Sequence, residues 1–139
     1  MGLFDRLRGK QELNLQPRAG LLLAALTMVA IDGDIDDDEV AIIKRIDGGS
    51  VTPAWEQAVQ AWKLKSPQDC VQLAAGAMNA EQRLCAMANL IDIAMADGVL
   101  ADAESTLLQA YVQAFQIPED DVAKIVEIIA LKNNKDVFQ

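Results

Sequence analysis

The chain has 139 residues, of which 52% are hydrophobic and only 4% aromatic, and its formal net charge at pH 7 is −9. That length gives room for one domain with a real core, and an apolar set dominated by Ala, Leu, Ile and Met favours an all-α bundle. The strong acidity argues against nucleic-acid binding, and the lack of histidine excludes a Cys/His zinc site and a histidine general base.

Residues 1–16 are expected to form a basic, amphipathic lead-in to a helical domain that spans residues 17–139. Four basic and two acidic residues lie in the first eighteen positions, so these carry +2 and the remainder carries −11. Three apolar residues lie among the charges of the lead-in: Leu3, Phe4 and Leu7. Two interpretations of residues 1–10 stay open: weak contact with an anionic membrane surface, or a frayed or self-docked terminus.

No membrane-directed segment is expected in this sequence. The first ten residues carry charges within their apolar part and are not followed by a small-residue cleavage site, so they do not resemble a signal peptide. The longest apolar run, residues 19–31, is shorter than the roughly 20 residues that a spanning helix needs. A cytoplasmic location is therefore expected.

Apolar periodicity, capping residues and glycine breaks together predict a compact bundle of about seven helices. They are expected at residues 17–32, 37–46, 53–64, 67–77, 80–97, 102–115 and from 118 onward. The helices at 17–32 and 80–97 should be the central pair. Asn79 and Gln82 have the spacing of a capping box, and the last helix has apolar residues at i, i+3, i+4 and i+7: Val122, Ile125, Val126 and Ile129.

An internal repeat relates residue n to residue n+65. Both copies contain a D-G turn, an apolar residue two positions after the glycine, and an acidic start to the next helix. The matched pairs are Asp32 with Asp97, Gly33 with Gly98, Ile35 with Leu100, Asp37 with Asp102 and Glu39 with Glu104. Two such helical hairpins in one domain predict a pseudo-two-fold arrangement around the two central helices.

Two copies of an apolar helix, an A/I-D-G-x-I/L-x-x-x-E turn and an amphipathic helix resemble the TerB-like family of tellurite-resistance proteins. The same domain occurs at the start of some DnaJ-like co-chaperones. The resemblance covers residues 17–131, and it implies an all-helical fold, no established enzymatic activity and an acidic metal-binding surface. The chain departs from the pattern at Ala101, where a capping Ser or Asp is usual, while the first copy has Asp36. We therefore expect the first turn to bind a cation better than the second.

The acidic turns allow two interpretations. Carboxylates beside free helix-end carbonyls suit Ca²⁺, Mg²⁺ or Mn²⁺. The first-site ligands would be Asp32, Asp34, Asp36 and Glu39, and the weaker second-site ligands would be Asp97, Asp102 and Glu104. Alternatively, these residues cap helices and stabilise their positive ends, and no cation is required. An EF-hand is excluded, because Asp37 and Ile43 stand where its glycine and bidentate glutamate belong.

The sequence thus predicts a non-enzymatic, TerB-type stress-response module linked to tellurite resistance. A protein partner is expected, and oligomer formation stays open. The alternative is a metal-independent protein-interaction module that uses its acidic surface. A redox enzyme that reduces tellurite is disfavoured, because the sequence shows no thiol pair or cofactor motif.

Three further features are expected to be structural. Asp92 should be a partly buried, hydrogen-bonded residue and not a catalytic one. Cys70 and Cys85 should be small core residues. Trp55 and Trp62, which lie seven positions apart on one helical face, should pack between helices, with an aromatic patch for a partner protein as the alternative.

Overall fold

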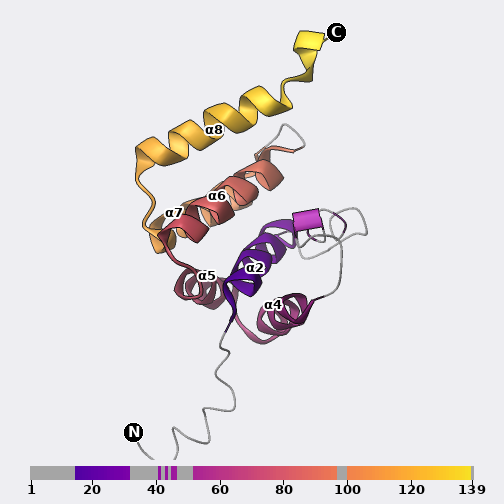
Figure 1. Cartoon of the computed structure of the whole chain (residues 1–139), viewed down its shortest axis with the longest axis vertical. Helices are drawn as coiled ribbons and strands as arrows, with labels where there is room; N and C mark the ends of the chain where they lie inside the picture. The colour runs from indigo at the N-terminus through magenta and orange to yellow at the C-terminus, as the bar shows by residue number, and fades with distance from the viewer. Residues whose placement is uncertain are drawn as a thin grey trace, which may run out of the picture.

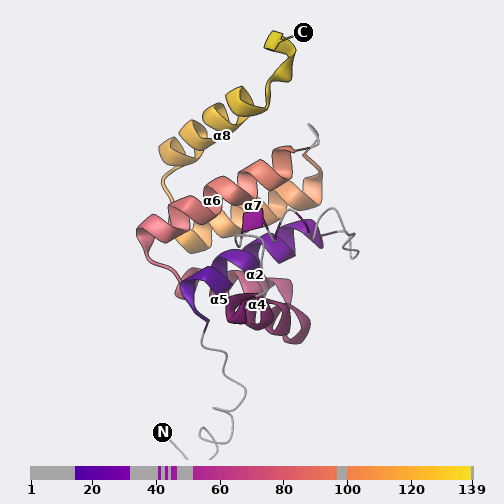
Figure 2. The ribbon, with the colours of Figure 1, turned by 45° about the vertical axis from the view of Figure 1, so that its right-hand side comes forward.

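The computed structural model describes residues 15–31, 41, 43, 45–46, 52–96 and 100–138. Over these residues the chain forms α-helices and one short 3₁₀ helix, and this described part contains no strand. The elements are α2 (Pro17–Val29), α4 (Pro53–Leu64), α5 (Pro67–Gly76), α6 (Ala80–Met95), α7 (Asp102–Phe115), α8 (Glu119–Asn133) and the 3₁₀ helix η2 (Lys135–Phe138). From one end of the molecule to the other, Figures 1 and 2 show α8, then α6 with α7, then α2 with α4 and α5 packed around it. The all-α prediction is confirmed.

Helix α2 is the centre of the fold. Ten of its 13 residues are buried, and Leu22 and Leu23 have no exposed surface. It contacts α4, α5 and α6. A helix that is apolar nearly all round needs neighbours on most sides, and α2 has them. Although it is strongly apolar, neither it nor any other described helix combines the length and hydropathy needed to cross a membrane.

A glycine sets the close approach of α2 and α5. A Cβ atom added at Gly20 would lie 3.0 Å from the Cβ of Ala77 and 3.2 Å from the carbonyl oxygen of Ala74. A larger residue at position 20 would therefore push the two helices apart. Glycine is intrinsically unfavourable inside a helix. At position 20 the close packing of α2 on α5 leaves no room for a larger residue.

Helix α4 packs on α2 through small side chains. The Thr52 hydroxyl caps the helix by accepting a 3.2 Å hydrogen bond from the backbone N–H of Trp55. The buried face is a stripe of alanines at i, i+4 and i+7: Ala54, Ala58 and Ala61. Trp55 and Trp62 are half-buried beside this stripe and pack against the same core cluster. The packing interpretation of the two tryptophans is confirmed, although the alanines make up the fully buried surface.

Helix α6 begins as predicted and ends earlier. The Asn79 side chain accepts a 2.9 Å hydrogen bond from the Gln82 N–H, and the Gln82 side chain accepts a 2.8 Å bond from the Asn79 N–H. This is the expected capping box. The helix ends at Met95, not at residue 97. The Ala96 N–H donates to the Ile93 carbonyl at 3.3 Å, and such an i to i+3 contact tightens and closes the last turn.

Helix α8 is attached to the bundle along one side only. Val122, Ile125 and Ile129 pack partly buried against the core, as their spacing predicts. Val126 remains 37% exposed. No residue of α8 is buried, and its principal neighbour is α6. The helix is therefore the most loosely covered of the described helices.

The predicted pseudo-two-fold arrangement stays a prediction. The helix expected at residues 37–46 falls mostly outside the described residues, of which 41, 43, 45 and 46 are helical. The lead-in up to residue 14 also lies outside them. One further correspondence is visible in the structure: Pro53, the first residue of α4, and Pro118, the N-cap residue of α8, are 65 positions apart. The α2–α4 contact then has its counterpart in the α6–α8 contact.

Candidate functional site

Most of the predicted cation ligands lie outside the described residues. These are Asp32, Asp34, Asp36, Glu39 and Asp97. Asp102 and Glu104 are described; both lie in the first turn of α7, where Asp102 is exposed and Glu104 is half-buried. Within the ranges that the structure covers, no three carboxylate or thiol side chains are grouped to hold a metal ion.

The start of α7 lacks a side-chain cap, as the sequence predicts. Ala101 occupies the N-cap position with an extended backbone (φ −69°, ψ 154°) and makes no side-chain hydrogen bond. The carboxylates of Asp102 and Glu104 therefore lie beside uncapped backbone N–H groups. Negative charge at this end of a helix is stabilising by about 0.3–1 kcal/mol per residue. The placement of these two residues helps the helix to start, with or without a cation.

Asp92 joins α6 to the end of α8. Its carboxylate lies 3.2 and 3.3 Å from the Lys132 ammonium, and it accepts a 3.4 Å hydrogen bond from the Asn133 side chain. The Asp92 side chain is 39% exposed. Asp92 is thus partly buried and hydrogen-bonded, as predicted from the sequence. The neighbouring Asn89 side chain is engaged within its own helix, because it donates to the Cys85 carbonyl at 3.0 Å.

The two cysteines have different surroundings, and the prediction that both are core residues is wrong for one of them. Cys70 is buried, and its thiol lies 3.8 Å from the Ala61 carbonyl. Burial raises the pKa of the Cys70 thiol, and the negative charge of Asp69 raises it further. Cys85 is exposed, because it faces away from the neighbours that α6 packs against.

An apolar groove lies between α7 and α8, with α6 as its floor. We define it by Met87, Ile91 and Met95 of α6, Leu108 and Val112 of α7, and Val126 of α8. Its volume is about 360 Å³. The groove exists because α8 packs mainly on α6, so that the side of α7 that faces α8 is incompletely covered. Sites of this kind accept apolar ligands or side chains.

The groove was not predicted from the sequence. The available signal was in the last helix, whose apolar residues extend beyond the face formed by Val122, Ile125, Val126 and Ile129. Ile128 and Leu131 lie outside that face and are 64% and 74% exposed. A helix with apolar residues on more than one side has more apolar surface than one neighbour can cover.

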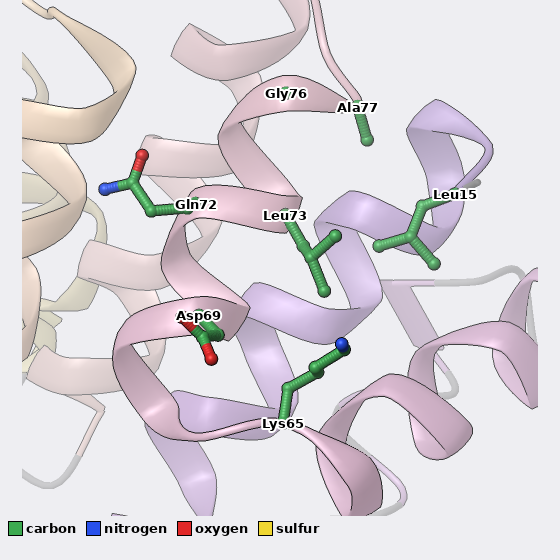
Figure 3. Close-up of a pocket in the computed structure, with 7 residues that line it drawn as sticks. All are labelled: Leu15, Lys65, Asp69, Gln72, Leu73, Gly76 and Ala77. Atoms are coloured by element: carbon green, nitrogen blue, oxygen red, sulfur yellow. The ribbon is translucent and has the colours of Figure 1, made fainter. Parts of the chain in front are cut away.

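A second cavity, of about 590 Å³, lies along α5. Figure 3 shows the side chains of Leu15 and Leu73 pointing toward one another across it, with the Lys65 ammonium directed into the same space. Gly76 lies on its wall, and a Cβ atom added there would meet nothing within 4 Å. The lining mixes these groups with the charged Asp69, and we assign it no ligand.

The family model for the tellurite resistance protein TerB matches residues 55–127, which is more than half of the chain. The chain belongs to the TerB family. No curated protein and no solved structure matches it.

The TerB match runs from α4 into α8 and contains the second D-G turn with Asp97, Asp102 and Glu104. Helix α2 and the first D-G turn precede the matched residues. The family resemblance seen in the sequence is thus confirmed on the second copy of the repeat. The acidic turn with more carboxylates belongs to the part of this TerB protein that the match does not cover.

Proposed function

We propose that this TerB protein is a non-enzymatic binding module that acts in the cytoplasm in the response to tellurite or metal stress. In this proposal the two D-G turns bind divalent cations such as Ca²⁺, Mg²⁺ or Mn²⁺. The observation that supports it most directly is the placement of Asp102 and Glu104 in one uncapped helix turn, immediately after the second D-G turn. Carboxylate oxygens are the ligands that hard cations prefer.

The test is the melting temperature of the full chain with and without millimolar Ca²⁺, Mg²⁺ or Mn²⁺. A cation that binds only the folded state stabilises it by mass action and raises Tm. The Asp32→Asn variant should lose more of this shift than Asp97→Asn, because the first turn has more carboxylates. Asp120→Asn, at an exposed acid of α8, is the matched control and should keep the full shift. An unchanged Tm of the wild-type chain would contradict cation binding.

The burial of Cys70 argues against one kind of enzyme, a thiol reductase that would use this residue. A buried thiol with a raised pKa holds little of the thiolate that a nucleophilic or redox cysteine needs. We therefore expect a Cys70→Ser/Cys85→Ser double variant to retain tellurite resistance in cells. Loss of resistance in a variant that still folds and accumulates normally would support thiol chemistry instead.

A second candidate function is recognition of a basic protein partner without metal. The specific observation is charge: residues 102–123 carry five acidic residues and no basic one. Three of the five lie in the first turn of α8: Glu119, Asp120 and Asp121. A lysine-rich helical peptide should bind the chelator-treated protein, and added salt should weaken the binding. Reversing charge with Glu119→Lys/Asp120→Lys should weaken it too, whereas a requirement for added cation would favour the first proposal.

A further inference from the structure

The largest exposed apolar side chains of the described residues are concentrated near residue 138. Five of the nine lie between residues 126 and 138: Val126, Ile128, Leu131, Val137 and Phe138. Phe138 is 88% exposed and Val137 is 68% exposed. Both belong to η2, which follows α8 directly. Adjacent large apolar residues at such exposure are typical of a surface that another molecule covers.

The helix η2 does not return to its own bundle. The end of α8 is held to α6 by Asp92, through Lys132 and Asn133. In Figures 1 and 2, η2 then projects away from α6 and α7. Val137 and Phe138 therefore point away from the bundle. They lie in a short helix that follows Lys132 and Asn133, the two residues held by Asp92.

The apolar groove has the size and the chemistry to receive these side chains. Its volume of about 360 Å³ is many times the roughly 30 Å³ that one water molecule occupies in the liquid, which is ample for a Phe side chain. Its walls are aliphatic and methionine side chains, and methionines adapt their shape to an inserted ring. Ser105 and Gln109 of α7 also line the groove.

The surroundings of the groove are strongly acidic, whereas residues 124–138 carry a net charge of +1. The first turn of α7 supplies Asp102 and Glu104 close to Leu100 at one end of the groove. The first turn of α8 supplies Glu119, Asp120 and Asp121 just before Val122 at the other end. Residues 124–138, in contrast, carry three lysines against Glu127 and Asp136. Lys135 lies at the start of η2, three positions before Phe138.

We propose that two copies of this chain associate by exchanging η2: Val137 and Phe138 of each copy enter the apolar groove of the other. Lys135 then lies against the acidic first turns that flank the groove. Because donor and acceptor occur once in every copy, two reciprocal insertions close a symmetric dimer. Each insertion covers both the exposed ring of Phe138 and the aliphatic walls of the groove.

The experiment is sedimentation equilibrium of the full chain from micromolar to millimolar concentration. We expect a monomer–dimer equilibrium that weakens with added salt, because part of the attraction is between charges. Phe138→Ser removes one ring from each of the two insertions. Burial of one such side chain lowers the Kd about tenfold, and the dimer contains two of them. The variant should therefore raise the dimer Kd about a hundredfold. Gln109→Phe, which fills the groove from an exposed position of α7, should raise it as well.

Leu131→Ser is the matched control, because it also removes a strongly exposed apolar side chain but from the body of α8. It should leave the Kd unchanged. Circular dichroism and Tm confirm that each variant is folded. A chain that stays monomeric at all concentrations overturns the proposal, and so does a dimer that Phe138→Ser leaves intact. Equal weakening by Leu131→Ser also overturns it, because the contact would then be the outer face of α8 and not an inserted η2.

Discussion

The hydroxyl groups of Thr27 and Tyr111 lie 2.5 Å apart in the core and join α2 to α7. The two residues are 84 positions apart in the chain. Thr27 also donates a 2.7 Å hydrogen bond to the Ala24 carbonyl, which uses its only proton. Tyr111 is therefore the donor in the pair. The Tyr111 ring is fully buried, and its centroid lies 5.3 Å from the centroid of the Phe115 ring.

Removing either hydroxyl should destabilise the protein, but by different amounts. Thr27→Val keeps the shape of the side chain and leaves the Tyr111 hydroxyl buried without an acceptor, which should lower the free energy of unfolding by about 1–3 kcal/mol. Tyr111→Phe leaves Thr27 with its bond to Ala24, so it should cost only about 0.5–1.5 kcal/mol. Urea unfolding measures both. The double variant should lose less than the sum of the two losses; additive losses would contradict a direct pair.

The same tyrosine should make stability depend on alkaline pH. Burial raises the pKa of Tyr111 above its ordinary value of 10.0. Above about pH 10 the unfolded chain releases this proton while the folded chain retains it. The free energy of unfolding should therefore fall with rising pH, by up to about 1.4 kcal/mol per pH unit from this group. Below pH 10 the contribution is constant.

Tyr111→Phe is the control for this pH dependence, because it removes the titrating group and leaves every lysine in place. The wild type should lose stability more steeply than the variant above pH 10. Tyr111 is the only tyrosine in the chain, so tyrosinate absorbance should appear together with unfolding and not before it. Ionisation that precedes loss of helical signal would show that the hydroxyl is accessible in the folded protein.

A hydroxyl at position 101 should stabilise α7. Ala101 has the extended backbone of an N-cap residue but no side-chain oxygen. Ala101→Ser should raise the free energy of unfolding by about 1 kcal/mol. Ala103→Ser places the same hydroxyl at an exposed position inside the first turn, where it cannot cap, and it should give no gain. Chemical denaturation of the two variants compares them directly, and equal effects would contradict a capping role.

The Asp92–Lys132 pair should hold the end of α8 while adding little to overall stability. Because both side chains are partly exposed, Asp92→Asn should change the free energy of unfolding by less than about 1 kcal/mol. Hydrogen exchange of the amides at the end of α8 should nevertheless become faster, since local opening is no longer opposed. Glu127→Gln, at another exposed acid, should leave this exchange unchanged. Unaltered protection in Asp92→Asn would mean that packing alone holds the helix end.

Helix positions could be predicted from local chemistry. The N-cap residues Thr52, Ser66 and Asn79 each accept a side-chain hydrogen bond from the backbone N–H three residues further on. These signals lie within four residues of one another, so they need no knowledge of the tertiary fold. The family could also be predicted, because the D-G turn and the helix after it are local in sequence.

Features that depend on how helices meet could not be predicted. Cys85 was expected in the core, but α6 has apolar residues on several sides, and only its neighbours determine which side is covered. The partner of Thr27 is a residue of a distant helix. The apolar groove results from the gap between α7 and α8, and no local pattern encodes the spacing of two helices.

The central place of α2 affects how this protein can be divided. The family match starts at residue 55, inside α4, and so omits α2. Yet α2 contacts α4, α5 and α6, and most of its side chains are buried. A truncated version confined to residues 55–127 would present three uncovered apolar helix surfaces to water, and we expect it to precipitate. The part of the chain that the family model matches is thus smaller than the packed unit, which includes α2.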